Sequence, residues 1–162
     1  MRLFYTFFIL FFLIPNARSE GRNVLLFTID SCRADRFGTY GSKAGVTPNI
    51  DQWARTGTVF TRAYSVSAWT APGLVSILTG LYPYTHNLFP GTHWDYERML
   101  TTRIKDAGYA TAGISANTLI SQANNFDRGF DYFEVYNWSD ARLLNNNVLN
   151  YLETYRPEGR PF

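Results

Sequence analysis

Cysteine is almost absent from this sequence of 162 residues: Cys32 is the only one, so an intramolecular disulfide is excluded. An excess of charge of one sign is also missing. The 15 Lys and Arg residues stand against 13 Asp and Glu residues, which gives a formal net charge of +2. Because no basic run accompanies this small excess, the composition argues against a nucleic-acid partner.

Long hydrophobic runs are missing after the first residues of the chain. Residues 3–14 are apolar almost without interruption, follow a basic Met1-Arg2 start and are too few to span a bilayer. With the small residues Ala17 and Ser19 behind them, they predict a secretory signal peptide over residues 1–19. The mature chain is then exported, to a periplasm or the extracellular space, without a stable membrane span. The alternative is an uncleaved N-terminal segment that anchors the chain in a membrane.

A continuous apolar, β-rich run covers residues 23–29 and ends at Asp30. The pattern predicts a strand that is buried on both faces of a parallel sheet. A carboxylate at the carboxyl end of such a strand lies where open α/β sheets bind ligands, and Ca²⁺, Mg²⁺ and Zn²⁺ all accept carboxylate oxygen. Asp30 is therefore a candidate metal ligand, and equally a loop residue that caps the next turn. Cys32 is expected to be a small buried residue beside this site.

Thr70 lies where an extended stretch, residues 60–64 and beyond, gives way to a short helix that follows Pro72. Proline suits a first helical turn, because its φ is fixed and it has no N–H to leave unpaired. Backbone N–H groups and the helix dipole favour an oxyanion at such a point, and a hydroxyl there can attack a phosphate or sulfate ester. The alternative is that Thr70 only caps the helix.

Helices and strands alternate along the rest of the chain. The predicted helices cover residues 47–57, 96–107 and 140–155, and the predicted strands cover residues 59–61 and 109–115. Thr47 can cap the first helix, a left-handed Gly57 can end it, and Ser139 can cap the last one. The apolar face of the first helix is expected to pack on a sheet. The order of elements is typical of βαβ crossovers in an α/β fold.

The stretch around Thr70 resembles the nucleophile motif of the sulfatase family, within the alkaline phosphatase superfamily. That motif reads Cys or Ser, any residue, Pro, Ser, Arg, three residues and Leu-Thr-Gly, followed by Tyr-Pro and a His. The matching positions are Thr70, Pro72, Leu78, Thr79, Gly80, Tyr82, Pro83 and His86. Two positions depart from it: Thr70 replaces the Cys or Ser that becomes formylglycine, and Leu74 replaces the Arg.

Three further segments resemble sulfatases in the family's order. They are the metal-binding segment 30–41, the Thr-Pro-Asn-Ile-Asp helix at 47–51 and the Gly-Phe-Asp turn at 129–131. In the first of these segments, Asp30 occupies the position of the family's first metal ligand. Ser31 takes the place of a second Asp that many sulfatases have. After the strand at 109–115 the family often has Gly-Lys-Trp-His, whose Lys and His contact sulfate. Here Asn117 can hydrogen-bond an anionic ester, or it can serve only in the turn.

The resemblance implies an alkaline phosphatase-like three-layer α/β sandwich with a mostly parallel sheet, of which residues 20–162 form the N-terminal part. It implies a divalent metal ion, Ca²⁺, Mg²⁺, Mn²⁺ or Zn²⁺, that is held by Asp30 and Thr70. Thr70 is then also the catalytic nucleophile, and Asn117 is a substrate-binding residue.

The implied function is an exported, metal-dependent hydrolase of sulfate esters of small molecules or glycans. A threonine ester cannot expel sulfate by collapsing to an aldehyde, as a formylglycine hydrate can, so Thr70 also favours phosphate esters. The uncharged Ser31, Leu74 and Asn117 leave an alternative, a non-catalytic secreted binding or vestigial domain. The family's later metal ligands have no counterpart in this sequence, so the isolated chain is expected to be inactive or nearly so. Every hypothesis in which the chain binds a metal ion requires Asp30 and Thr70 to lie side by side at the rim of one sheet.

Overall fold

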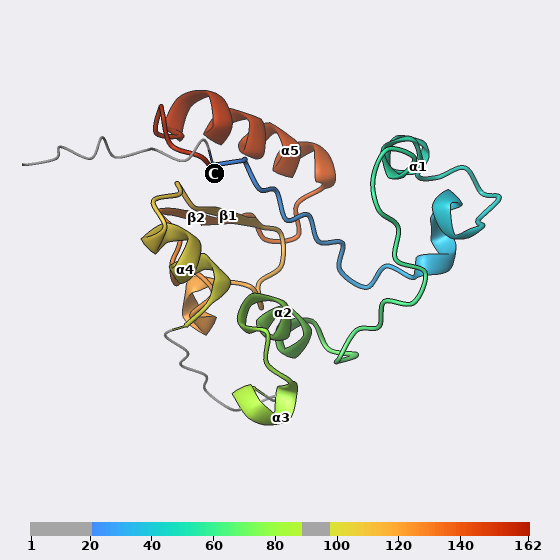
Figure 1. Cartoon of the computed structure of the whole chain (residues 1–162), viewed down its shortest axis with the longest axis horizontal. Helices are drawn as coiled ribbons and strands as arrows, with labels where there is room; N and C mark the ends of the chain where they lie inside the picture. The colour runs from blue at the N-terminus through green and yellow to red at the C-terminus, as the bar shows by residue number, and fades with distance from the viewer. Residues whose placement is uncertain (1–20, 89–97) are drawn as a thin grey trace, which may run out of the picture.

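A small parallel sheet between helices forms the centre of the molecule (Figure 1). The computed structural model describes residues 21–88 and 98–162, so the predicted signal peptide lies outside the described residues. In chain order the elements are η1 (Ala34–Arg36), η2 (Gly38–Tyr40), α1 (Pro48–Ala54), α2 (Thr70–Thr79), α3 (Pro83–His86), α4 (Leu100–Asp106), β1 (Ala112–Ser115), η3 (Gln122–Asn124), β2 (Tyr132–Val135), α5 (Ala141–Asn150) and η4 (Tyr151–Tyr155), where η marks a short 3₁₀ or π-helical turn. None of the described helices has the length and hydropathy needed to cross a bilayer.

The sheet and its covering helices give the predicted α/β architecture. Strands β1 and β2 run parallel, with Ala112 opposite Tyr132 and Ser115 opposite Val135. In Figure 1, α5 lies on one side of the sheet, and α2 and α4 lie on the other. The α/β class and the parallel sheet are thus confirmed.

The hydrophobic core lies between α2 and the sheet. Its buried members are Val75, Leu78, Leu88, Met99, Ile120 and Phe126, and Phe133 of β2 packs against them. Phe126 is 1% exposed and Met99 is fully buried. Because Val75 and Leu78 belong to α2, this core fixes the helix that begins at Thr70.

The helices predicted after residue 95 are present. The first is α4, and residues 96 and 97 of the predicted range lie outside the described residues. The second, predicted over residues 140–155, is α5 continued by η4. Its cap is Asp140, whose Oδ1 accepts from the Leu143 N–H at 2.9 Å, so the prediction of Ser139 was wrong by one residue.

Tyrosines join η4 to the sheet. The ring of Tyr132 in β2 lies 4.9 Å from that of Tyr151 and 5.8 Å from that of Tyr155, measured between centroids. Burial raises the pKa of Tyr132 to about 12. Strand β2 itself was not predicted, because only the Gly-Phe-Asp turn at residues 129–131, directly before it, was identified.

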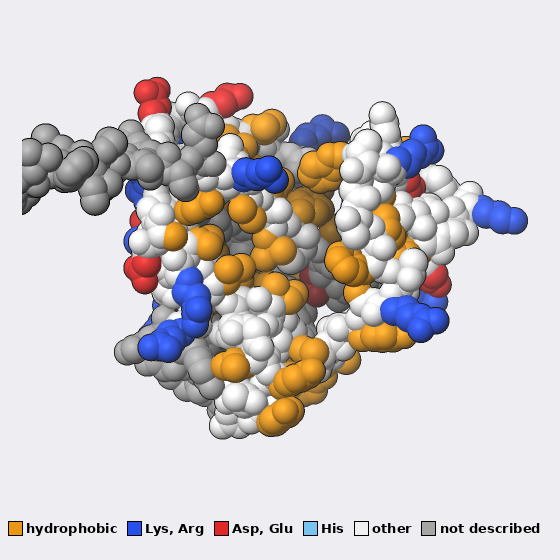
Figure 2. All heavy atoms as spheres, in the orientation of Figure 1, with side chains coloured by type: hydrophobic (Ala, Val, Ile, Leu, Met, Phe, Trp, Pro, Cys, Tyr) orange, Lys and Arg blue, Asp and Glu red, His pale blue; other side chains and the backbone are white. Residues whose placement is uncertain are grey.

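The strand predicted over residues 23–29 is absent, and so is the one over residues 59–61. The first run is extended but exposed, with Leu25 at 63% and Phe27 at 66%. Figure 1 shows it crossing the molecule on its own, and Figure 2 shows hydrophobic side chains gathered along its path. A run of apolar residues becomes a strand only where a neighbouring strand accepts its hydrogen bonds. Within the described residues this run has such a neighbour only at its start.

That neighbour is the segment that ends at Phe162. The Val24 N–H donates to the carbonyl of Phe162, and the Phe162 N–H donates to the side-chain oxygen of Asn23 at 3.2 Å. One residue earlier, the carbonyl of Pro161 accepts from the Ala110 N–H at 2.8 Å. Residues 161 and 162 therefore bond on one side to the chain just before β1 and on the other to the N-terminal run.

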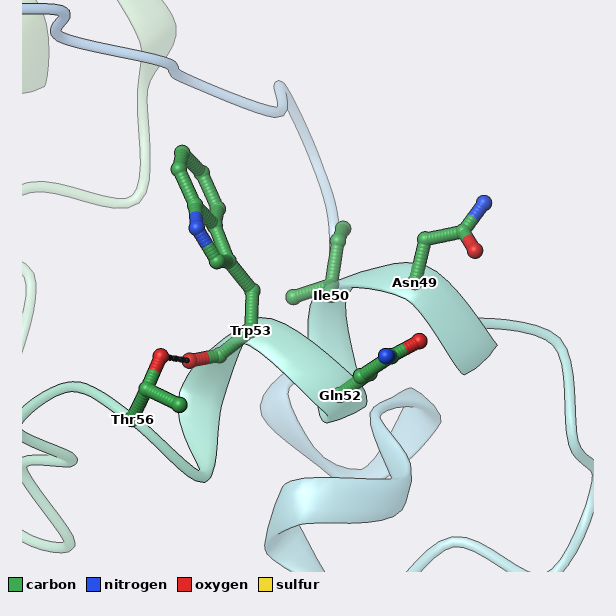
Figure 3. Close-up of a pocket in the computed structure, with 5 residues that line it drawn as sticks. All are labelled: Asn49, Ile50, Gln52, Trp53 and Thr56. Atoms are coloured by element: carbon green, nitrogen blue, oxygen red, sulfur yellow. Dashed lines mark hydrogen bonds between the residues drawn. The ribbon is translucent and has the colours of Figure 1, made fainter.

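Helix α1 forms where predicted, but its apolar face does not pack on the sheet. Trp53 is 72% exposed, and in Figure 3 it and Ile50 project from the helix beside a surface hollow that Asn49, Gln52 and Thr56 complete. Gly57 has no left-handed φ, so that prediction was also wrong. Asp51 anchors α1 to η2 instead, since its carboxylate accepts from the Thr39 N–H at 2.8 Å and from the Thr47 hydroxyl at 2.9 Å.

Candidate functional site

Thr70 is the first residue of α2, as the sequence predicts. Trp69 before it is extended, with φ −110° and ψ 140°, and its carbonyl accepts the first helical hydrogen bond from Gly73. The change from extended to helical backbone therefore falls between Trp69 and Thr70. Thr70 is half-buried, and it stands at the end of the helix where the macrodipole is positive.

Asp30 lies directly against Thr70. The Thr70 hydroxyl donates to the two carboxylate oxygens of Asp30, at 3.0 Å to Oδ1 and 3.3 Å to Oδ2. The chain reverses just after Asp30, where Ser31 adopts a left-handed φ of 54°. The Ser31 hydroxyl then reaches back to Asp30 Oδ1 at 3.4 Å. The expected juxtaposition of Asp30 and Thr70 is therefore present.

Asn117 completes this group of side chains from the sheet. It lies two residues after the end of β1, and its side-chain amide donates to Asp30 Oδ2 at 2.8 Å. The Leu119 N–H donates to the other side of the same amide, Oδ1, at 2.9 Å. This second bond fixes the amide orientation. Asn117 therefore presents N–H donors to the site, which suits an anionic oxygen and not a metal ion.

The oxygen atoms of Asp30 and Thr70 are the ligand type that hard divalent cations prefer. Two such ligands are a partial set, and the residues that the structure describes contain no cluster of three or more His, Cys, Asp or Glu side chains. The donor chemistry thus fits a divalent ion, while the remaining coordination positions must be filled from elsewhere.

Three neighbouring residues do not contribute as ligands. Cys32 is exposed, so the expectation that it is buried beside the site was wrong. Asp35 forms an ion pair with Arg33 at 2.6 Å, and that pair lowers the pKa of Asp35. Leu74, at the family's Arg position, packs against the hydrophobic core.

Sequence reasoning missed a buried polar pair behind Thr70. His86 is 3% exposed, and its Nε2 lies 3.0 Å from the hydroxyl oxygen of Ser76 in α2. Burial lowers the pKa of His86, and smaller backbone interactions with Pro72 and His86 itself oppose this shift. The signal in the sequence that could have revealed this pair is the spacing of ten residues between Ser76 and His86, across the Leu-Thr-Gly turn.

Comparison with known proteins places this sequence in a family. The family model described as Sulfatase matches residues 22–156. The chain is 26% identical, over 86% of its length, to an N-acetylglucosamine-6-O-sulfatase of Bacteroides thetaiotaomicron, and covers 29% of that protein. It is 31% identical, over 76% of its length, to the mouse iduronate 2-sulfatase, and covers 22% of that protein. An arylsulfatase of Clostridium perfringens is 30% identical over 63% of the chain, which covers 22% of that protein.

The chain thus spans less than a third of the length of these relatives. Its match to the family model over most of its length fits the N-terminal part of a sulfatase domain, which has the alkaline phosphatase-like fold. This chain belongs to the sulfatase family.

Proposed function

We propose that this chain supplies the nucleophile, two metal ligands and one substrate-binding donor to an exported, metal-dependent hydrolase of sulfate or phosphate esters. The observation that supports this most directly is the contact between the Thr70 hydroxyl and the Asp30 carboxylate, at 3.0 Å and 3.3 Å. Membership of the sulfatase family favours ester hydrolysis as the reaction. Export rests on the signal-like residues 1–19.

Thr70 is the proposed nucleophile. Its Oγ1 forms a bond to the sulfur or phosphorus of the ester, the bond from that atom to the alcohol oxygen breaks, and the alcohol leaves. The hydroxyl proton passes to the Asp30 carboxylate, which already accepts its hydrogen bond, and from there to the departing alcohol oxygen. Water then attacks the Thr70 ester, which frees the hydroxyl and releases sulfate or phosphate.

Asp30 and Thr70 are the residues that would hold the ion, because they are the oxygen donors that meet at the start of α2. A bound divalent ion lowers the pKa of a hydroxyl and screens charge on the ester oxygens. The Asn117 amide donates one N–H to Asp30 and can donate the other to an ester oxygen. It lies two residues after the end of β1, and the Leu119 N–H holds this amide in place.

Threonine at the nucleophile position favours phosphate esters, whereas the family and its named relatives favour sulfate esters. A trapped intermediate separates these options. In a polypeptide that joins this chain to the remainder of a sulfatase domain, acid quenching during turnover of an aryl phosphate monoester should leave phosphothreonine at Thr70. Mass spectrometry detects it, Thr70→Ser should give phosphoserine, and Thr70→Ala should give neither. Sulfate release from an aryl sulfate without any phosphorylated Thr70 would contradict phosphoryl transfer.

The role of Asp30 as a ligand is testable by ion binding in the same joined polypeptide. Asp30→Asn should weaken Mn²⁺ binding by at least about 100-fold, since even outer-shell partners of metal ligands contribute 10–100-fold. Asp35→Asn is the matched control, because Asp35 lies nearby and pairs with Arg33. Calorimetric titration measures both. Equal affinity in the two variants would remove Asp30 from the metal site.

By itself, the 162-residue chain should hydrolyse neither an aryl sulfate nor a phosphodiester, because two protein ligands hold a divalent ion poorly. A sensitive assay of released aryl alcohol should give the same rate for the chain and for its Thr70→Ala variant. Turnover that Thr70→Ala abolishes would show that the site is complete within this chain.

A non-catalytic secreted domain is the second candidate function. It is favoured by one specific observation, that the Asp30 carboxylate already accepts hydrogen bonds from Thr70, Asn117 and Ser31. Such a carboxylate can be a structural junction with no ion. A joined polypeptide that binds no divalent cation would support this function over the first.

A further inference from the structure

Two polar side chains meet in the buried layer behind the start of α2. His86, the last residue of α3, is 3% exposed, and Ser76 of α2 is 8% exposed. The His86 Nε2 and the Ser76 Oγ are 3.0 Å apart. They adjoin the apolar core to which Val75 and Leu78 of the same helix belong.

The hydrogen bonds around His86 assign its proton. The Leu88 N–H donates to Nδ1 at 3.2 Å, so Nδ1 carries no proton. The neutral ring therefore bears its proton on Nε2, and this N–H donates to the Ser76 hydroxyl oxygen. Burial lowers the pKa of His86, which agrees with a neutral ring. Both ring nitrogens thus have a fixed partner.

The hydrogen bond ties the ring directly to α2. Ser76 belongs to this helix and lies six residues after Thr70, its first residue. His86 therefore holds α2 at Ser76. Contacts among Val75, Leu78 and their apolar neighbours are not directional, whereas hydrogen bonds fix rotation and position.

From this geometry we infer that the His86–Ser76 hydrogen bond positions Thr70, by fixing the rotation of α2 so that the Thr70 hydroxyl at its start meets the Asp30 carboxylate. His86 acts through α2 and touches no reacting atom, so it is a positioning residue. The contact between Thr70 and Asp30 is seen in the structure, and only its use in catalysis rests on the proposed function.

Nuclear magnetic resonance of the whole 162-residue chain tests this inference without any assay of activity. The measured signals are the nuclear Overhauser effects from the Thr70 methyl group to the Asp30 Hβ protons and to the Asn117 side-chain amide. Ser76→Ala and His86→Leu should each lose most of this intensity. The double variant should lose no more than either single variant, because both remove the same bond. His86→Gln should restore part of it, since a glutamine amide can donate to the Ser76 hydroxyl.

Thr111→Val is the matched control. Thr111 is 3% exposed, and its hydroxyl donates to the carbonyl of Gly129 at 2.8 Å, just before β1 and outside α2 and α3. It loses a buried hydroxyl as Ser76→Ala does, yet it should leave the Thr70 signals unchanged. Should His86→Leu fail to fold, Ser76→Ala decides the test by itself.

Unchanged Thr70 signals in Ser76→Ala, or an equal loss in Thr111→Val, would overturn the inference. Neither result would touch the proposed function, which is decided by the trapped intermediate at Thr70. Conversely, the absence of that intermediate would leave the positioning of Thr70 by His86 intact as a structural property.

Discussion

Phe126→Ala should cost the chain about 3–5 kcal/mol of its free energy of unfolding, as large-to-small changes of buried aromatic residues do. Phe126 is 1% exposed and lies in the core with Val75, Leu78 and Met99, so its removal leaves a cavity between α2 and the sheet. A domain of this size typically has about 5–15 kcal/mol of stability in total. The variant should therefore melt roughly 6–20 °C lower, or be unfolded at room temperature.

Ile77→Ala is the control for this change. Ile77 lies on the same helix as Val75 and Leu78 but is 54% exposed, so its truncation should alter stability by no more than about 0.5 kcal/mol. Urea titration followed by circular dichroism gives both values. Similar losses for Phe126→Ala and Ile77→Ala would mean that the core is not where the structure places it.

Acidification should destabilise the folded chain in two separate steps, and His86 should produce the first. Its folded-state pKa lies below its unfolded value of about 6.5, so the unfolded chain binds more protons in the interval between the two. The stability that the neutral ring contributes is complete above about pH 6.5 and is lost as the pH falls through the folded pKa. The slope in this interval is at most about 1.4 kcal/mol per pH unit.

The second step comes from aspartates whose pKa is lowered in the folded state. Hydrogen bonds and charge from Lys105 lower the pKa of Asp131, and the Thr39 backbone lowers that of Asp51. Their contribution is present above about pH 3.9 and is lost below it, so the two steps do not overlap fully.

Urea midpoints measured from about pH 8 to about pH 5 isolate the first step. His86→Leu should be less stable throughout but should show no dependence on pH in this range. His93→Gln replaces the other histidine of the sequence and should keep the dependence of the unchanged chain. A pH dependence that survives His86→Leu would show that another group carries it.

Helix positions were predictable because their signals are local. Pro72 and the extended residue before Thr70 mark the start of α2, and Gly108, with a φ of +92°, ends α4 as its place in the sequence indicates. The cap at Asp140 was missed by one residue, because Ser139 is an equally good capping type and the choice depends on where the chain turns.

Strands depend on partners that a local pattern does not reveal. Residues 23–29 have the composition of a buried strand, but past Val24 no described segment offers them backbone hydrogen bonds. Strand β2 was missed for the opposite reason. Its four residues follow directly on the Gly-Phe-Asp turn and are too few to show a strand pattern by themselves, and they become a strand because β1 pairs with them.

In the candidate site, the pairing of Asp30 with Thr70 was expected from the resemblance of both segments to sulfatase motifs, and it is present although residues 23–29 before Asp30 form no strand. The orientation of Asn117 could not be read from the sequence. It is set by the Leu119 N–H, and thus by the path of a single turn after β1. The position of His86 depends on how α3 folds back under α2, which is a property of tertiary packing.

The bond from Val24 to Phe162 also constrains the order in which the molecule can be built. Asn23 and Phe162, which meet there, are 139 residues apart in the sequence. Bringing the two segments together therefore carries a large entropic cost, which grows with the length of the loop between them. A nascent polypeptide cannot make this bond until Phe162 has been synthesised. The exposed apolar stretch after Asn23 therefore stays without this partner until synthesis has reached at least residue 162, and a holdase chaperone would find a target there.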